Sequence, residues 1–140
     1  MIKICFVCTG NTCRSIMAER LLKKVIKEKK IDDVKVISRG LEATGEQITD
    51  NAKKTLKRLN ASSQNRKSIK LGKIDKNILY ITMTDSQKNK INSKKVLSFK
   101  SLIGEEVLDP YGLDEEAYFE TALQIQKGIE VLIEKINLWR

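Results

Sequence analysis

The first thirty residues place the strongest constraint on the fold. Residues 2–7 form an apolar run interrupted only by Lys3, which is typical of a central strand of a parallel sheet, buried on both faces. The run ends in the segment Cys8-Thr-Gly-Asn-Thr-Cys-Arg-Ser15. Apolar residues then recur at helical spacing up to the charged stretch 27–30, so we expect a helix to begin at or just after Ser15.

The rest of the chain continues the alternation of strand and helix, which favours a parallel sheet. The patterns predict strands at 34–38, 78–83 and 96–99, and helices at 50–59, 84–91 and 113–138. Residues 61–77 are polar and rich in lysine, and we expect them to form a surface excursion. A length of 140 residues predicts a single domain, residues 1–140.

The chain contains no histidine, and this absence restricts its chemistry. It excludes the Ser-His and Cys-His couples as well as the commonest transition-metal ligand. The three cysteines, Cys5, Cys8 and Cys13, lie too close together in sequence to form the disulfide framework of a secreted domain. Any catalysis must therefore use cysteine, carboxylate, arginine or backbone groups.

The net charge of +9 indicates anionic partners. The lysines are spread along the chain and aromatic residues make up only 5%, which argues against nucleic acid and favours acidic or phosphorylated targets. No apolar run approaches the ~18 residues of a membrane span, and no signal-peptide cleavage site is recognisable. We therefore expect a cytoplasmic protein without membrane or nucleic-acid partners.

The segment from Cys8 to Ser15 has the position of an anion-binding site. It leaves the carboxyl end of a parallel strand and leads into a helix, where ligands of open α/β sheets bind. We expect Gly10 to permit a backbone conformation in which successive N–H groups turn inward. Arg14 can then grip two phosphate oxygens at once.

Cys8 is the predicted nucleophile. It would lie at the bottom of this cradle, where N–H groups, the helix dipole and Arg14 all favour the thiolate. We expect the Ser15 hydroxyl to donate to the sulfur and the Asn11 amide to tie the loop to neighbouring backbone.

The other two cysteines have different predicted roles. Cys5 and Cys8 match the redox pattern C-x-x-C, but residues three apart in a strand face opposite sides of the sheet, so Cys5 is expected in the core. Cys13 lies in the same loop as Cys8 and is the predicted partner for a reversible disulfide.

The single proline marks a second site segment, Asp109-Pro110-Tyr111, just before the last predicted helix. A phosphoryl acceptor needs a group that protonates the leaving group, and Asp109 is the natural acid. By itself, an Asp-Pro pair is a common turn.

Together these residues resemble the low-molecular-weight protein tyrosine phosphatase family. The family's nucleophile loop C-x-G-N-x-C-R-S is matched by Cys8, Gly10, Asn11, Cys13, Arg14 and Ser15, and its late Asp-Pro-aromatic loop by Asp109, Pro110 and Tyr111. The resemblance implies a flavodoxin-like, three-layer α/β/α fold with a four-stranded parallel sheet. It also implies a cysteinyl-phosphate intermediate, release of inorganic phosphate, and no metal or cofactor.

Two positions depart from the family pattern. Ile16 replaces the usual proline after the loop serine, and Ser38-Arg39-Gly40 replaces Ser-Ala-Gly. Neither change affects the expected chemistry, but we expect Arg39 to alter the rim of the site.

Thr12 indicates the substrate. Tyrosine-specific members of the family usually have isoleucine or another bulkier apolar residue there, whereas the protein-arginine phosphatase branch has the same eight residues, Cys8 to Ser15, as this chain. We therefore expect phosphoarginine in proteins as the substrate, with phosphotyrosine as the alternative. The phosphate-binding loop comprises Thr9, Gly10, Asn11, Thr12, Cys13, Arg14 and Ser15, with Thr12 and Tyr111 as the selectivity residues.

Three other classes fit less well. A sugar-transport phosphocarrier should not need the Arg14 clamp or the acid Asp109. A thioredoxin-coupled arsenate reductase requires a cysteine beyond Cys13, and the sequence has none there. A non-catalytic phosphopeptide-binding module remains a distant alternative, which hydrolysis of para-nitrophenyl phosphate would exclude.

Overall fold

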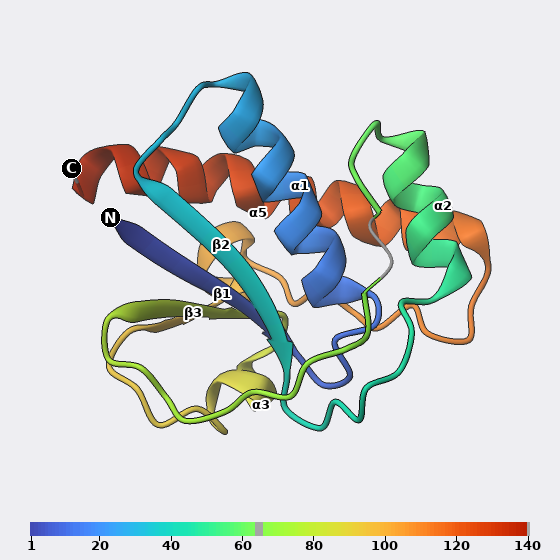
Figure 1. The fold of residues 1–140 in the computed structure, drawn as a ribbon, viewed down its shortest axis with the longest axis horizontal. Helices are drawn as coiled ribbons and strands as arrows, with labels where there is room; N and C mark the ends of the chain where they lie inside the picture. The colour runs from blue at the N-terminus through green and yellow to red at the C-terminus, as the bar shows by residue number, and fades with distance from the viewer. Residues whose placement is uncertain (64–65, 140) are drawn as a thin grey trace.

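A computed structural model describes residues 1–63 and 66–139, and in this part of the chain a parallel sheet of four strands carries helices packed against it (Figure 1). The strands are β1 (Ile2–Cys8), β2 (Val34–Gly40), β3 (Ile78–Thr82) and β4 (Val96–Ser98). The helices are α1 (Arg14–Glu28), α2 (Asp50–Arg58), α3 (Asp85–Lys88), α4 (Phe99–Ile103) and α5 (Glu115–Trp139). This three-layer α/β/α architecture confirms the expected fold class.

The strand order β2-β1-β3-β4 puts β1 inside the sheet, as its apolar sequence predicts. Parallel pairing aligns Cys8 with Gly40 of β2 and Val7 with Thr82 of β3. The carboxyl ends of these strands therefore meet at one edge of the sheet. The start of β1 and the end of α5 lie at the opposite end in Figure 1, where Met1 and Trp139 line the same cavity.

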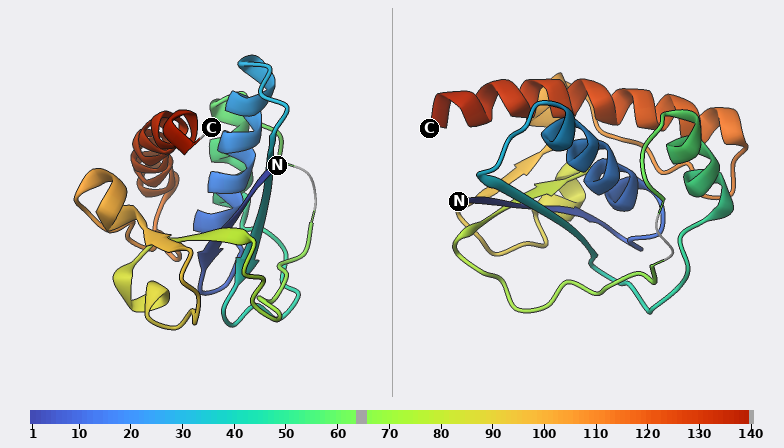
Figure 2. Two further views of the ribbon diagram at one scale, coloured as in Figure 1. Left: turned by 90° about the vertical axis from the view of Figure 1, so that its left-hand side faces the viewer. Right: turned by 45° about the horizontal axis from the view of Figure 1, so that its top comes forward.

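The two faces of the sheet carry different cores. The larger core contains Ile4, Phe6 and Cys8 of β1 together with buried residues of α1, α2 and α5. The long helix α5 crosses this side of the sheet (Figure 2). On the other face, Cys5 packs in a smaller cluster with Ile91, just after α3. Cys5 and Cys8 thus face opposite sides, as predicted, which argues against a redox C-x-x-C pair.

One helix was not predicted from the sequence. The expected strand 96–99 ends at Ser98, and Phe99 begins α4, which ends at Gly104 with a left-handed φ of 79°. The buried ring of Phe99 packs against α5 where that helix has Gly128. A Cβ at position 128 would overlap Phe99 Cε2, so the glycine is what permits this approach.

Among the described residues, no helix combines the length and apolar character needed to cross a membrane.

Candidate active site

The loop between β1 and α1 is held in place by the segment that follows β2. Backbone N–H groups of Leu41 and Glu42 donate to the carbonyls of Cys8 and Thr9, each at 2.9 Å. The N–H of Thr49 donates to the Thr12 carbonyl at 3.1 Å. Both ends of the loop are therefore fixed by backbone contacts that do not depend on a ligand.

The tight turn in this loop uses Asn11 rather than Gly10, which corrects the expectation from the sequence. Asn11 has a left-handed φ of 56°, whereas Gly10 is not among the residues with positive φ. Asparagine adopts this region more readily than most residues. Gly40 is essential beside it, because a Cβ at position 40 would lie 2.9 Å from the Asn11 backbone nitrogen.

Cys8 lies beneath the turn with its sulfur among hydrogen-bond donors. The Asn11 N–H donates to Cys8 Sγ at 3.3 Å, and Ser15 Oγ lies 3.0 Å from the same sulfur. Only 2% of Cys8 is exposed. These contacts stabilise negative charge on the sulfur, since a thiolate accepts both hydrogen bonds.

The start of α1 contributes further donors. Helices α2 and α3 are capped by the side chains of Thr49 and Thr84, but the residue that precedes α1, Cys13, makes no side-chain cap. The first turn of α1 contains no acidic residue either. Its leading N–H groups thus remain available to an anion at the loop.

Arg14 is buried at the edge of the loop with part of its guanidinium unpaired. Nη1 donates to the carbonyl of Val107 at 2.9 Å, which orients the group. Nη2 lies 3.7 Å from Asp109 Oδ2, while the buried Nε has no hydrogen-bond partner among the described residues. A buried, unpaired donor is costly, so Nε is suited to a ligand oxygen.

Asp109 reaches the loop from the segment before α5. Its Oδ1 accepts the Tyr111 N–H at 3.1 Å and lies 3.6 Å from Cys13 Sγ. About half of its side chain is exposed, in contrast to the buried Arg14. The fold thus brings together the residues from both predicted site segments, far apart in sequence.

A pocket of about 210 Å³ lies among these residues. Its walls are formed by Cys8, Thr9, Gly10, Thr12, Cys13, Arg14, Glu46, Asp109 and Tyr111. Asn11 and Ser15 are not among these lining residues, although both contact the Cys8 sulfur. Arg39 does not line this pocket; its Nη1 donates to the Ser38 carbonyl at 2.7 Å, so the expectation that it alters the rim is not supported.

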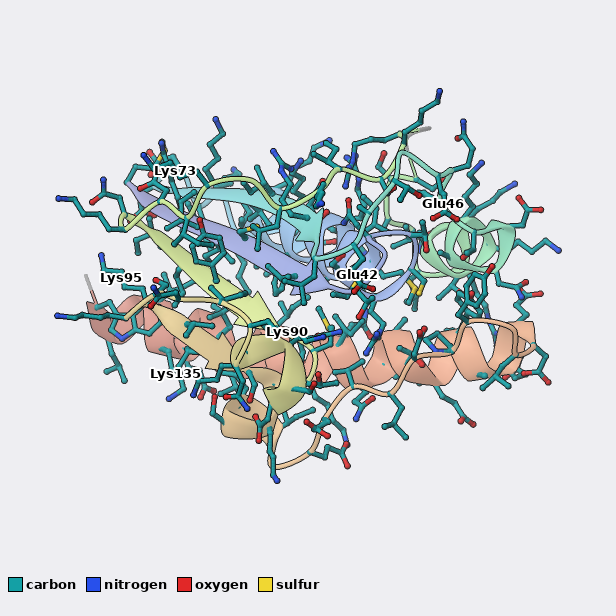
Figure 3. All side chains as sticks on the ribbon, turned by 90° about the horizontal axis from the view of Figure 1, so that it is seen from below. Glu42, Glu46, Lys73, Lys90, Lys95 and Lys135 are labelled. Carbon is teal, nitrogen blue, oxygen red and sulfur yellow. The ribbon has the colours of Figure 1, made fainter. Side chains whose placement is uncertain are left out.

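Glu46 is a wall residue that no motif in the sequence indicates. It lies on the segment between β2 and α2, as does Glu42 (Figure 3). Its backbone N–H donates to Ser68 Oγ at 2.9 Å, and its carbonyl accepts the Ser68 N–H at 2.7 Å. These two bonds fix the backbone of Glu46 at the wall of the pocket, and its Oε1 accepts a hydrogen bond from Thr44 Oγ1 at 2.9 Å.

A polar network beneath the loop was also missed. Asn11 Nδ2 donates to the hydroxyls of Ser15 and Ser38 at 2.7 and 3.0 Å, and Ser38 donates to the buried Glu19 at 2.7 Å. Arg66 joins this network, donating to Ser38 Oγ at 2.7 Å and to Asn11 Oδ1 at 3.2 Å.

The expectation that residues 61–77 form only a surface excursion is therefore wrong. In this segment, Arg66 contacts Glu19 at 3.4 Å and the Ile69 N–H donates to Asn11 Oδ1 at 3.0 Å. The Ile69 bond is the expected tie between the Asn11 amide and neighbouring backbone. Positions 64 and 65 of the segment lie outside the described residues. Partial burial lowers the pKa of Arg66, and the carboxylate of Glu19 opposes this shift.

Two of the cysteines are held in the thiol form. Burial raises the pKa of Cys5 to about 12, and it raises the pKa of Cys13 to about 12 as well, with Cys8 and Asp109 adding to the effect at Cys13. Neither group carries appreciable charge at neutral pH.

Residues 3–138 match the family described as low molecular weight phosphotyrosine protein phosphatase. A protein-arginine-phosphatase of Geobacillus stearothermophilus is 32% identical over 146 residues, covering 96% of each chain. The low molecular weight protein-tyrosine-phosphatase PtpA of Staphylococcus aureus is 31% identical, covering 99% of this chain and 98% of its own.

Solved structures agree with this match. The YwlE arginine phosphatase of Geobacillus stearothermophilus superimposes with a TM-score of 0.86 at 31% identity, covering 99% of this chain and 94% of its own. A YwlE variant whose active-site cysteine is replaced by serine carries phosphate on that serine; it has a TM-score of 0.82 at 29% identity, covering 97% of this chain and 96% of its own.

Proposed function

Since the chain belongs to the low molecular weight phosphotyrosine protein phosphatase family and is a protein phosphatase, we propose that it removes phosphate from phosphoarginine in proteins through a phosphorylated Cys8. The observation that supports the proposal most directly is that Cys8, Arg14 and Asp109 line the same small pocket. The three groups supply a nucleophile, an oxyanion clamp and an acid, which phosphoryl transfer needs.

In the first step, the Cys8 thiolate attacks phosphorus. The S–P bond forms as the bond from phosphorus to the guanidinium nitrogen breaks, and Asp109 gives its proton to that nitrogen. Arg14 Nε and the leading N–H groups of α1 bind the equatorial phosphate oxygens.

In the second step, water hydrolyses the phosphocysteine. The Asp109 carboxylate accepts a proton from the water, which attacks phosphorus, and the S–P bond breaks to regenerate the Cys8 thiolate and release inorganic phosphate. Ser15 and the Asn11 N–H stabilise the departing sulfur. No step of this scheme uses a metal or cofactor, and we propose that it takes place in the cytoplasm.

The walls of the pocket support phosphoarginine. Thr12 offers a hydroxyl that can accept a guanidinium N–H, and Glu46 and Asp109 add carboxylate acceptors at the same pocket. A guanidinium presents several N–H donors, each costing about 1 to 3 kcal/mol if it is buried unpaired. An aromatic leaving group offers no such donors and would gain nothing from these acceptors.

Phosphotyrosine is the second candidate. The exposed ring of Tyr111 lines the pocket and suits contact with another aromatic ring, and PtpA is named for tyrosine phosphatase activity. The choice between the two substrates depends on whether polar or aromatic contacts dominate at the pocket walls.

The experiment is a comparison of kcat/KM on two peptides of one sequence, phosphorylated on arginine or on tyrosine. Thr12→Ile should lower phosphoarginine hydrolysis by about tenfold or more while preserving or raising phosphotyrosine hydrolysis, because it removes an acceptor and adds an apolar branch. Thr12→Ser, which keeps the hydroxyl, is the matched control. Equal loss on both peptides would contradict a selectivity role for Thr12.

A further inference from the structure

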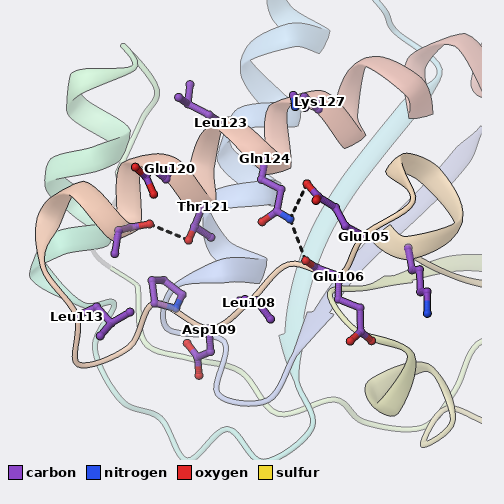
Figure 4. Close-up of a pocket in the computed structure, with 13 residues that line it drawn as sticks. Glu105, Glu106, Leu108, Asp109, Leu113, Glu120, Thr121, Leu123, Gln124 and Lys127 are labelled. Atoms are coloured by element: carbon purple, nitrogen blue, oxygen red, sulfur yellow. Dashed lines mark hydrogen bonds between the residues drawn. The ribbon is translucent and has the colours of Figure 1, made fainter.

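A second cavity adjoins the active-site pocket and plays no part in the chemistry above. Its volume is about 850 Å³, and it lies between the segment 105–113 and α5 (Figure 4). Asp109 lines both cavities. A polypeptide whose phosphorylated side chain enters the small pocket would therefore have its neighbouring residues beside this groove.

The walls of the groove carry aliphatic side chains that solvent reaches. Leu108 and Leu113, on the segment before α5, are 73% and 58% exposed, and Leu123 on the facing helix is 41% exposed. All three are labelled in Figure 4. Val107, next to Leu108, is fully buried, so only the leucine of this pair is turned outward. Exposed apolar side chains gathered around one groove are typical of an interaction site.

The groove is also acidic, in a chain whose net charge is +9. Glu105, Glu106 and Glu120 line it, as does Asp109, against the two lysines Lys100 and Lys127. Glu105 accepts a hydrogen bond from Gln124 at 3.1 Å and Glu106 accepts one from the Asp85 N–H at 2.7 Å. Both donors are neutral, and within the described ranges none of the three glutamates of the groove has a cationic partner.

We propose that this groove binds the part of a substrate polypeptide next to its phosphorylated residue, and that it favours segments carrying an aliphatic side chain together with a lysine or arginine. The leucines provide apolar contact area, and the glutamates provide a charge complementary to a basic segment. The inference rests on the proposed function, because it needs a phosphorylated polypeptide in the pocket. It applies whether the phosphorylated residue is arginine or tyrosine.

The test compares peptides with a small substrate. Leu123 and Glu120 lie three residues apart on α5, outside the catalytic loop, and both are exposed. The double variant Leu123→Ser, Glu120→Lys should raise KM at least about fivefold for a phosphopeptide containing leucine and lysine, while kcat stays unchanged. Para-nitrophenyl phosphate, which fills only the pocket, should be hydrolysed as by the unmodified enzyme.

Two controls sharpen the result. Glu134→Lys makes the same change of charge at an exposed position of α5 that does not line the groove, and should leave both substrates unaffected. A peptide with glutamate in place of its lysine should be a poor substrate for the unmodified enzyme and a better one for Glu120→Lys.

Three results would overturn the proposal. An equal loss on para-nitrophenyl phosphate would mean that the groove acts through the acid segment. An unchanged KM for the basic peptide would mean that the groove binds no substrate. A dimer of the unmodified enzyme in sedimentation, dissociated by the double variant, would mean that the occupant is a second copy of the chain. Phosphoarginine and phosphotyrosine versions of each peptide keep the test independent of which residue is the true substrate.

Discussion

Among single residues, Asp109 and Arg14 differ in exposure, and this difference fits their proposed roles as acid and phosphate clamp. Arg14 is buried and oriented by the Val107 carbonyl, while about half of the Asp109 side chain is exposed to solvent. Asp109→Asn keeps the acceptor for the Tyr111 N–H but removes the acid. We expect a loss of ~10²-fold or more in kcat with little change in KM.

The role of Asp109 is tested by how strongly the rate of the Asp109→Asn variant depends on the leaving group of the substrate. Phenyl phosphate, a poor leaving-group substrate, should lose far more than para-nitrophenyl phosphate, whose anion departs without a proton. The comparison uses kcat/KM, which reports the first step and not the later hydrolysis of phosphocysteine. If the asparagine variant lost the same fraction of kcat/KM on both aryl phosphates, Asp109 would not be the proton donor.

The three cysteines should differ sharply in reactivity. At pH 7 a thiol with a pKa of about 12 has a thiolate fraction of ~10⁻⁵, so Cys5 and Cys13 should resist iodoacetamide while Cys8 is labelled. Raising the pH should increase labelling of Cys5 and Cys13 about tenfold per unit, because their thiolates form only as the pH approaches the pKa. Peptide mapping by mass spectrometry measures all three sites, and labelling of Cys13 as fast as Cys8 at pH 7 would contradict this.

Cys13 is the proposed redox partner of Cys8 because of its position, since both residues border the loop between β1 and α1. Peroxide would oxidise the Cys8 thiolate to a sulfenic acid, and the Cys13 thiol would then form the disulfide with loss of water. A Cys13→Ala variant should recover less activity than the unmodified enzyme after thiol treatment, whereas Cys5→Ala should recover normally.

At the scale of elements, the catalytic loop depends on segment 66–70. Arg66 links Asn11, Ser38 and Glu19, and Asn11 supplies the N–H that donates to Cys8. We expect Arg66→Ala to lower kcat about tenfold and to reduce stability by about 1.5 to 3 kcal/mol, since a buried carboxylate loses charged hydrogen bonds.

The neighbouring exposed Lys67 provides the matched control for this prediction. Lys67→Ala keeps the backbone carbonyl that accepts from Arg66 and should change neither quantity. Turnover of para-nitrophenyl phosphate and the midpoint of urea unfolding measure the two effects. An Arg66→Ala enzyme with unaltered kcat would show that the network does not position the loop.

The elements near the first strand were predictable because their information is local. The apolar run of β1 and the helical spacing that follows predict a helix that begins at or just after Ser15, and α1 begins at Arg14. The extra helix α4 was missed because five residues are too few for a helical period to be recognised. The sequence favours Gly10 for the left-handed turn because glycine is the usual residue there, whereas the structure has Asn11 in that conformation.

Contacts between distant segments could not be read from the sequence. Glu46 and Arg66 reach the site because the chain pairs Gln47 with Lys67 and Gly40 with Lys70, and neither bridge has a local signature. Asp109 was found only because its proline and the family motif marked it. Nothing in the sequence around Glu19, in the middle of α1, indicates that its carboxylate is buried and accepts a hydrogen bond from Ser38.

At the scale of the whole molecule, the fold gathers three separate segments at one end of the sheet. The β1–α1 loop brings Cys8 and Arg14, the segment after β2 brings Glu46, and the segment before α5 brings Asp109. We propose that these groups act in one order, with Cys8 carrying the phosphoryl group between the substrate and water.

The most direct measurement is the mass of the enzyme during turnover, taken by rapid acid quench and followed by peptide mapping. With a phosphoarginine peptide, we expect an enzyme heavier by one phosphoryl group, attached to Cys8, and no such species in Cys8→Ala. A phosphoryl group on another residue, or turnover of the peptide by Cys8→Ala at the unmodified rate, would contradict it.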